Sequence, residues 1–215
     1  MPTTQIGGLI SVALNVDAAG NVQGAPVQLG SEDFGRPEIT RLSSGNFLFS
    51  STPIVPGPGV FVFAPMTWKI VTSTGQVVAQ QTLDAGTANP EVTTLADGTG
   101  LLAWTENNVP AAERIDDNGN VLGSASTPNA VPATVTGLAH GGYVFTWISG
   151  SQILAQYFTS AGAAAGDPFV VANNVDTSNT SAWYTVEQTP DGFITVYSTA
   201  DKQIYEVRVT APQLG

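Results

Sequence analysis

One pattern recurs four times along this chain: an alternating polar and apolar stretch, a tight turn with glycine, and a more continuous apolar run. The four copies read PEITRLSSGNFLFSS, PEVTTLADGTGLLAWTE, PATVTGLAHGGYVFTWIS and WYTVEQTPDGFITVYST, and they start at Pro37, Pro90, Pro132 and Trp183. The spacings between the turn glycines are 53, 43 and 51 residues, at Gly45, Gly98, Gly141 and Gly192. We predict that each copy is a β-hairpin whose glycine adopts a positive φ.

A second signature follows each of the first three hairpins. It consists of a strand, a turn with glycine and a short final strand, with the turns at Gly75, Gly119 and Gly162. The same element opens the chain around Gly20, whereas the fourth hairpin is followed by KQIYEVRVTAPQLG, which supplies the strand without a partner. Repeats of this length and composition are typical of β-propeller blades.

We therefore predict an all-β fold, a small β-propeller of about four four-stranded blades in a single domain that spans 1–215. The blade units are 37–88, 89–130, 131–175 and 183–210, and the N-terminal strand within 9–30 completes the last unit and closes the ring. Closure of this kind removes exposed sheet edges. A β-sandwich of similar length is the main rival, and a solenoid or an open fragment that closes by oligomerising are further alternatives. The internal similarity favours the propeller.

Composition restricts the partners. Only 11% of the 215 residues are charged, the net charge is −11, and the six Lys and Arg residues are scattered singly. Because nucleic acids and anionic membranes are bound by clustered basic residues, we expect neither as a partner. There are no cysteines, which excludes disulfides, thiol catalysis and thiolate metal sites.

The N-terminus shows no cleavable signal peptide, and no apolar run approaches the roughly 18 residues of a membrane span. The polar surface must come from Thr, Ser, Asn, Gln and Gly, which suits extracellular or virion proteins. We expect such a location, reached without a cleaved signal or within a virus particle, and no membrane insertion.

The stretch from His140 to Asn173 resembles tandem repeats of large secreted bacterial surface proteins, in which GG, an apolar run ending in Trp, AQxF and AGxxxG follow one another. The resemblance is moderate over 90–126, weaker over 37–81 and weakest over 183–210. It implies adhesion or surface display and supplies no catalytic residues. The aspartate-glycine nonapeptides of the calcium-binding class are missing from this sequence.

Catalytic and metal-binding patterns are weak. His140, the single histidine, lies at a hairpin turn, and we expect an exposed turn residue rather than part of a triad or a metal site. The DDNGN stretch at 116–120 is better explained as a turn rich in Asx residues than as a calcium loop. The carboxylates do not repeat, and no phosphate loop, nucleophile elbow or zinc motif is present. We therefore expect no enzyme activity, no cofactor and no metal.

Aromatic residues divide into two groups. A repeated position at the end of the second strand predicts core packing between blades, at Trp104, Trp147 and Tyr197. By contrast, Trp68 and Trp183 break the register, and we predict that they are exposed binding residues. Phe61 and Phe63 lie in a Pro-rich insert over 51–66, which predicts a rigid apolar contact loop.

These observations favour a non-catalytic propeller for recognition or adhesion, which binds surface glycans or a protein partner. The alternative is a structural component of a virus particle, such as a capsid protein or tail appendage. A carbohydrate-active enzyme is a minor alternative. Association into homo-oligomers fits the first two.

Overall fold

The computed structural model describes residues 11–16, 19–30, 37–56, 61–130, 133–178 and 184–214. Four antiparallel sheets follow one another along the chain, and each is a meander in sequence order. The first blade contains β3 (Glu38–Arg41), β4 (Phe47–Ser51), β7 (Thr67–Val71) and β8 (Val77–Thr82). The second contains β9 (Thr87–Thr94), β10 (Gly100–Glu106), β11 (Val109–Ile115) and β12 (Val121–Ser124). The third contains β13 (Ala133–Gly137), β14 (Tyr143–Ser149), β15 (Gln152–Phe158) and β16 (Phe169–Ala172). The fourth contains β17 (Tyr184–Thr189), β18 (Gly192–Ser198) and β19 (Ile204–Thr210). The predicted all-β, four-bladed propeller is confirmed.

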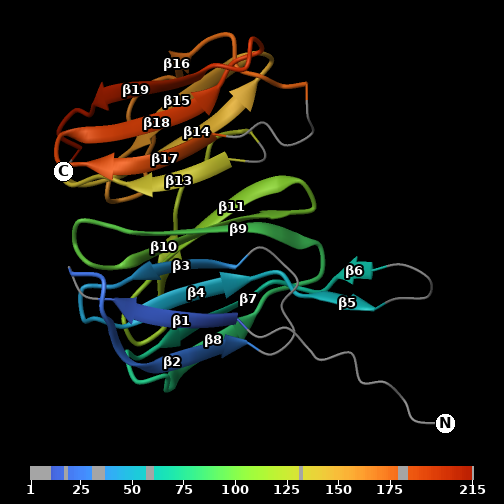
Figure 1. Cartoon of the computed structure of the whole chain (residues 1–215), viewed down its shortest axis with the longest axis vertical. Coiled ribbons are helices and arrows are strands. Elements are labelled where there is room, and N and C mark those ends of the chain that lie inside the picture. Colours follow the sequence, from blue (N-terminus) through green and yellow to red (C-terminus); the bar gives the residue numbers. More distant parts are fainter. Residues whose placement is uncertain are drawn as a thin grey trace.

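Two further hairpins stand outside the blades, β1 (Ser11–Val16) with β2 (Val22–Gly30), and β5 (Ile54–Pro56) with β6 (Phe61–Phe63). Figure 1 places β1 and β2 at the end of the molecule that holds the first blade, whereas the fourth blade lies at the opposite end. Within the described chain, β2 pairs with β1, and β19 pairs with β18 alone. Closure of the last blade by the N-terminal strand is therefore not shown. The described residues contain no helix long and apolar enough to span a membrane.

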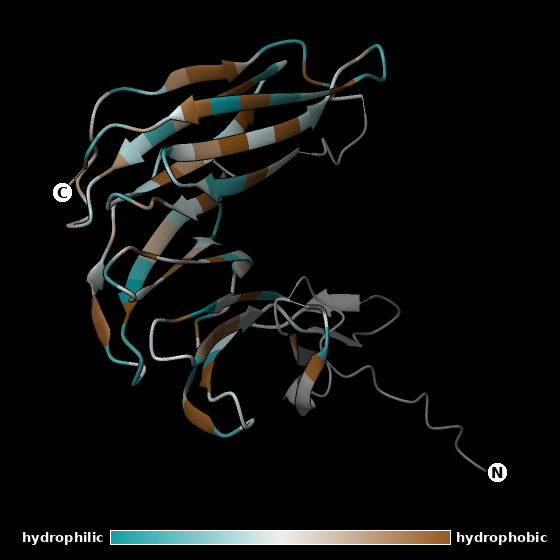
Figure 2. Cartoon of the chain, turned by 60° about the vertical axis from the view of Figure 1, so that its left-hand side comes forward, coloured by the Kyte–Doolittle hydropathy of each residue, from teal (hydrophilic) through white to brown (hydrophobic). Residues whose placement is uncertain are grey.

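Successive blades pack face to face through apolar cores. Strands coloured by hydropathy show the alternation that places apolar residues on these faces (Figure 2). In the core between the second and third blades, Tyr143 is stacked on Phe158 at 5.2 Å and Phe145 lies edge-on to both, with Trp147 in the same cluster. The repeated aromatic position is buried as predicted, at Trp104, Trp147 and Tyr197. Burial of large rings between neighbours explains why the repeat keeps an aromatic residue there.

The innermost strands, β3, β9, β13 and β17, contact one another in series. We call the face of a blade that is turned toward the next blade along the chain its forward face. The opposite face, turned toward the preceding blade, is its backward face. Hydrogen bonds join inner strands: between the Thr40 and Thr94 hydroxyls at 2.8 Å, from the Thr94 hydroxyl to the Arg41 carbonyl oxygen at 2.7 Å, and from the Gly137 N–H to the Thr93 hydroxyl at 2.9 Å. These bonds tie the forward face of one inner strand to the backward face of the next.

The predicted positive φ holds at Gly45, Gly98 and Gly141, but the prediction is wrong for Gly192. Gly192 is the first residue of β18, where a Cβ atom would lie 2.1 Å from the Val209 carbonyl oxygen. This glycine is required by close backbone approach instead of by turn geometry.

An ion pair closes the hairpin turn of the second blade, between the Arg114 guanidinium and the Asp97 carboxylate at 2.5 Å. Burial acts most strongly on the pKa of Asp97 and would raise it, but hydrogen bonds from Thr99 and the charge of Arg114 together hold it below its usual value. Because the folded pKa is depressed, this stabilisation is present above about pH 4 and is lost as pH falls through the folded pKa.

We expect Asp97→Asn to lower the free energy of unfolding by about 0.5 kcal/mol at neutral pH, since the Asp97 side chain is 45% exposed. The difference from wild type should vanish below about pH 3. Urea unfolding at several pH values measures it, with exposed Asp167 changed to Asn as the control. An equal loss for Asp97→Asn at every pH would contradict the role of the charge.

Candidate functional site

The four aromatic residues predicted to bind a ligand have different outcomes. Trp68 is the second residue of β7 and is 2% exposed, so the prediction of an exposed indole is wrong for this residue. Its ring packs in the core between the first and second blades. Trp183 lies outside the described residues. Phe61 and Phe63 lie in β6, and their side chains are outside what the structure describes.

The Pro-rich insert forms the β5–β6 hairpin, with Ile54 opposite Phe63. It separates β4 from β7, which are neighbours in the first blade. In an antiparallel blade, the end of the second strand and the start of the innermost strand lie at the same edge. The hairpin therefore leaves the blade at the edge where the innermost strands begin, and it projects to one side of the molecule (Figure 1).

At this edge, three inner strands bring polar side chains together: Glu91 on β9, Thr134 on β13 and Tyr184 on β17. The Tyr184 hydroxyl donates a hydrogen bond to the Thr146 carbonyl oxygen at 2.8 Å. Burial raises the pKa of Tyr184 above its usual value, the nearby Glu91 carboxylate raises it further, and a hydrogen bond with the Thr134 side chain opposes both. Tyr184 is therefore a neutral hydroxyl at physiological pH. We call Glu91, Thr134 and Tyr184 the inner polar site.

A second polar network lies along the start of β9. The Asn89 side-chain amide donates to the Thr105 hydroxyl at 3.1 Å, and this hydroxyl donates to the Ala88 carbonyl oxygen at 3.0 Å. Asn89 has a φ of 53°, and the pairing of β9 with β10 shifts register at this point. A bulge of this kind turns side chains away from the regular ladder, and bulges are frequent beside functional sites. Asn89 is exposed and so adds an amide next to the inner polar site.

A small cavity lies between the second and third blades, lined by Asn89, Trp104, Thr105, Phe145 and six smaller or partly apolar residues. Its volume of about 10 Å³ is close to what a single water molecule requires. The cavity is therefore too small for an organic ligand, and an open surface is the better candidate for binding.

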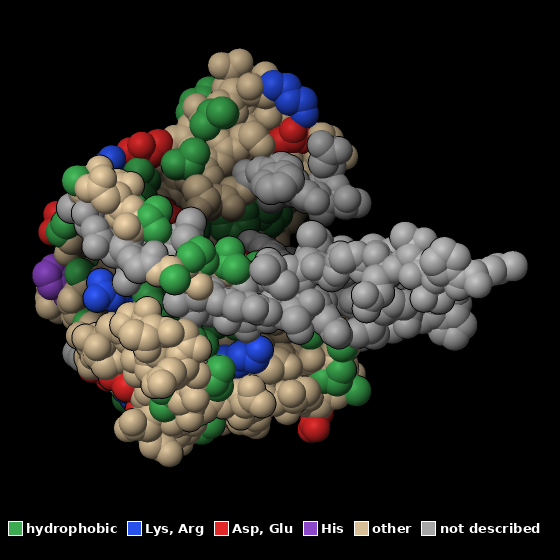
Figure 3. Space-filling model, turned by 60° about the horizontal axis from the view of Figure 1, so that its bottom comes forward, with side chains coloured by type: hydrophobic (Ala, Val, Ile, Leu, Met, Phe, Trp, Pro, Cys, Tyr) green, Lys and Arg blue, Asp and Glu red, His purple; other side chains and the backbone are tan. Residues whose placement is uncertain are grey.

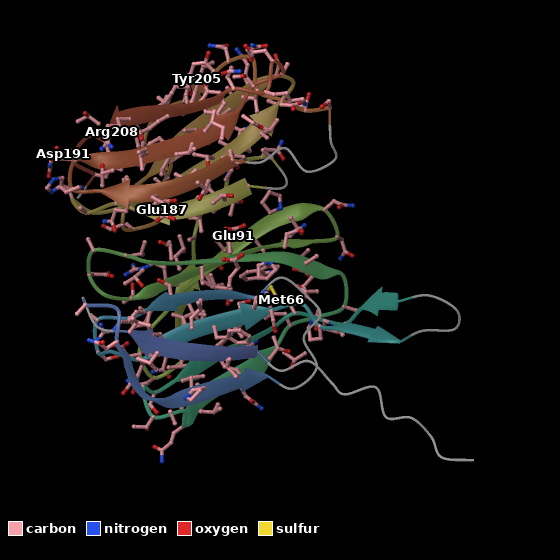
Figure 4. All side chains as sticks on the ribbon, in the orientation of Figure 1. Met66, Glu91, Glu187, Asp191, Tyr205 and Arg208 are labelled. Carbon is pink, nitrogen blue, oxygen red and sulfur yellow. The ribbon has the colours of Figure 1, made fainter. Side chains whose placement is uncertain are left out.

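Charge is spread thinly over the molecule. Figure 3 shows the Lys and Arg side chains separated from one another on the face it presents, without a basic patch. Figure 4 shows Glu91 and Glu187 near the middle of the molecule, whereas Tyr205 and Arg208 lie further out on the fourth blade. Within the described chain, no three His, Cys, Asp or Glu side chains are grouped as metal ligands would be. The inner polar site thus offers two hydroxyl groups and a carboxylate, and Asn89 beside it adds an amide; these groups suit hydrogen bonding to a neutral polar ligand.

Two local predictions concern turns. His140 is an exposed turn residue, as predicted. In the DDNGN turn, an Asp116 carboxylate oxygen accepts the backbone N–H groups of Asn118 and Asn120, each at 2.8 Å. These are the local hydrogen bonds of an Asx turn. The hydrogen bond from the Asn120 side chain lowers the pKa of Asp116 most, and the backbone hydrogen bonds lower it further.

No protein-family model matches the chain, and no curated protein matches it in sequence. Among solved structures, it is similar to a protein of unknown function from Bacteroides caccae, with a TM-score of 0.56, 13% identity, and 95% of this chain and 71% of that chain covered. It also matches a catalytically inactive virginiamycin B lyase from Staphylococcus aureus in complex with quinupristin, with a TM-score of 0.40, 14% identity and coverages of 95% and 76%. A third match is TolB from Acinetobacter baumannii, with a TM-score of 0.47, 15% identity and coverages of 87% and 47%. At such identities, the likeness to the Bacteroides caccae protein shows a shared fold and nothing about activity.

Proposed function

We propose that this protein is a non-catalytic binding module of an extracellular or virion setting, and that the inner polar site recognises a surface glycan. The observation that carries the proposal is the convergence of Glu91, Thr134 and Tyr184 from three different blades. Sugar hydroxyls both donate and accept hydrogen bonds, and the site supplies a carboxylate acceptor beside hydroxyl groups that do either. The phenol ring of Tyr184 adds an apolar surface next to these polar groups.

The β5–β6 hairpin supports the same location. It leaves the first blade at the edge where the inner polar site lies, and it has no counterpart in the other three blades. Insertions on a repeated scaffold are common positions for specificity. In a second form of the proposal, the ligand is a protein partner, and it binds the β5–β6 hairpin rather than the inner strands.

The test begins with a glycan array, followed by calorimetric titration of the best ligand. We expect Tyr184→Phe and Glu91→Gln each to weaken binding by about three- to tenfold, because each removes a hydrogen-bonding group or a charge without changing the shape of the side chain. Tyr205→Phe and Glu206→Gln, on exposed β19, are the matched controls and should bind as wild type does. Thermal unfolding of each variant verifies the fold.

Two results would overturn the proposal. Equal binding by the site variants and the controls would remove the inner polar site from recognition. A protein that binds no glycan but forms a stable high-order assembly would favour the structural component of a virus particle instead, and turnover of a polysaccharide would make it an enzyme.

A further inference from the structure

The two faces at the ends of the blade series differ from the faces buried between blades. On each innermost strand, one residue of the forward face pairs with an apolar residue of the second strand. We call it the forward position; its residues are Thr40, Thr93, Thr136 and Glu187. The next residue of each strand is the backward position, at Arg41, Thr94, Gly137 and Gln188.

Forward and backward positions meet at junctions between blades. Thr40 bonds to Thr94 where the first blade meets the second, and the Thr93 hydroxyl accepts the Gly137 N–H where the second meets the third. The forward and backward positions therefore face each other at these two junctions.

Opposite charges occupy these positions only at the two ends of the series. Glu187 is the forward residue of the fourth blade, and Arg41 is the backward residue of the first. Both are exposed, and neither forms an ion pair with a described residue. If the forward face of the fourth blade met the backward face of the first in the geometry of the other junctions, the Glu187 carboxylate would lie opposite the Arg41 guanidinium.

Apolar residues next to these charges are more exposed than their counterparts in the other blades. Ile39 on β3 is 44% exposed, whereas Val135 and Val186, at the same position of the third and fourth blades, are 4% and 8% exposed. Ile194 on β18 is half-buried, whereas its counterparts in the other blades are 0% exposed, at Leu48, Leu101 and Val144. Val92, the counterpart of Ile39 in the second blade, is half-buried. Ile39 and Ile194 are thus each more exposed at the end faces than their counterparts are at the junctions already formed.

We propose that two copies of this chain associate head to tail, with β17 and β18 of one copy packed on β3 of the other and Glu187 paired with Arg41. Phe49 and Val71, further out on the backward face of the first blade, are 1% exposed, so the contact is restricted to the innermost strands. The first and fourth blades lie at opposite ends of the molecule (Figure 1), which favours a contact with a second copy over a contact within one chain. Two such contacts related by a two-fold axis close a dimer. This inference does not depend on the glycan proposal.

Sedimentation equilibrium of the full chain tests the association. We expect a wild-type dimer, at least tenfold weaker association for Glu187→Arg and for Arg41→Glu, and recovery to within about threefold of wild type in the double variant that exchanges the two charges. Asp167→Arg makes the same charge change as Glu187→Arg at an exposed position away from both faces, and it should associate as wild type does. A monomeric wild type at roughly 100 μM, or a double variant no better than the single ones, would overturn the proposal.

Crosslinking separates a contact between copies from a contact within one chain. The chain has no cysteine, so introduced thiols are unique. Arg41→Cys and Glu187→Cys proteins, mixed and mildly oxidised, should give a disulfide-linked band of twice the chain mass, whereas Arg41→Cys mixed with Asp167→Cys should not. A double-cysteine chain that forms its disulfide only at monomer mass would show that the first and fourth blades of one chain meet, and it would overturn association with a second copy.

Discussion

Replacement of Trp68 by alanine should lower the free energy of unfolding by about 3–5 kcal/mol. The indole is 2% exposed and lies in the core between the first two blades, against Leu48 and Leu102. Its removal leaves a cavity at a junction that both blades need, and the rigid backbones of two sheets cannot collapse into it. Trp68→Phe keeps most of the apolar area and should lose less than half as much.

Urea unfolding followed by circular dichroism measures the loss. Tyr205→Ala is the matched aromatic control, because Tyr205 is 48% exposed on β19 and should cost about 1 kcal/mol. If Trp68→Ala were no more costly than Tyr205→Ala, the indole would not be a core residue, and the sequence-based prediction of an exposed binding tryptophan would be restored.

The scaffold could be predicted because each blade repeats the same physical requirements. Tight turns recur before the apolar strands, and Trp104, Trp147 and Tyr197 fill the same place between neighbouring sheets. Repetition reveals such residues without any structure, since a position that recurs at the blade period is explained by packing that also recurs.

The prediction for Trp68 is wrong because the Pro-rich insert interrupts the repeat just before β7, so the sequence does not show which position of the blade Trp68 occupies. In β7 it lies opposite Ser50, and the corresponding pairs in the next two blades are Ala112 with Ala103 and Ala155 with Thr146. The other complete blades therefore have small residues where the first blade has an indole, and the β5–β6 hairpin separates Trp68 from the strand it pairs with. An aromatic residue outside the repeated pattern is predicted to be exposed, whereas the structure shows that it fills the core in a different way.

The inner polar site could not be predicted as a unit. Glu91, Thr134 and Tyr184 are separated by more than forty residues from one to the next and share no local motif. They meet only because β9, β13 and β17 follow one another around the inner edge of the fold. A carboxylate is visible in the sequence, but its distance from a phenol two blades away depends on how the blades turn relative to one another.

Gly137→Ala should be the most damaging small change at an inner strand, with a loss of about 3 kcal/mol in the free energy of unfolding. A Cβ atom at this residue would lie 2.2 Å from the Thr94 carbonyl oxygen, which is backbone of the neighbouring blade and has no side-chain freedom to move away. The methyl group would push β13 off β9, break the 2.9 Å hydrogen bond from the Gly137 N–H to Thr93, and loosen the aromatic core behind it.

Gly150→Ala is the control. Gly150 has a φ of 59° and a Cβ atom there would meet nothing within 4 Å, so the substitution should cost about 1 kcal/mol from backbone conformation alone. Equal losses in urea unfolding would show that the inner strands can separate without cost, which would contradict an inner edge held by direct contact between backbones.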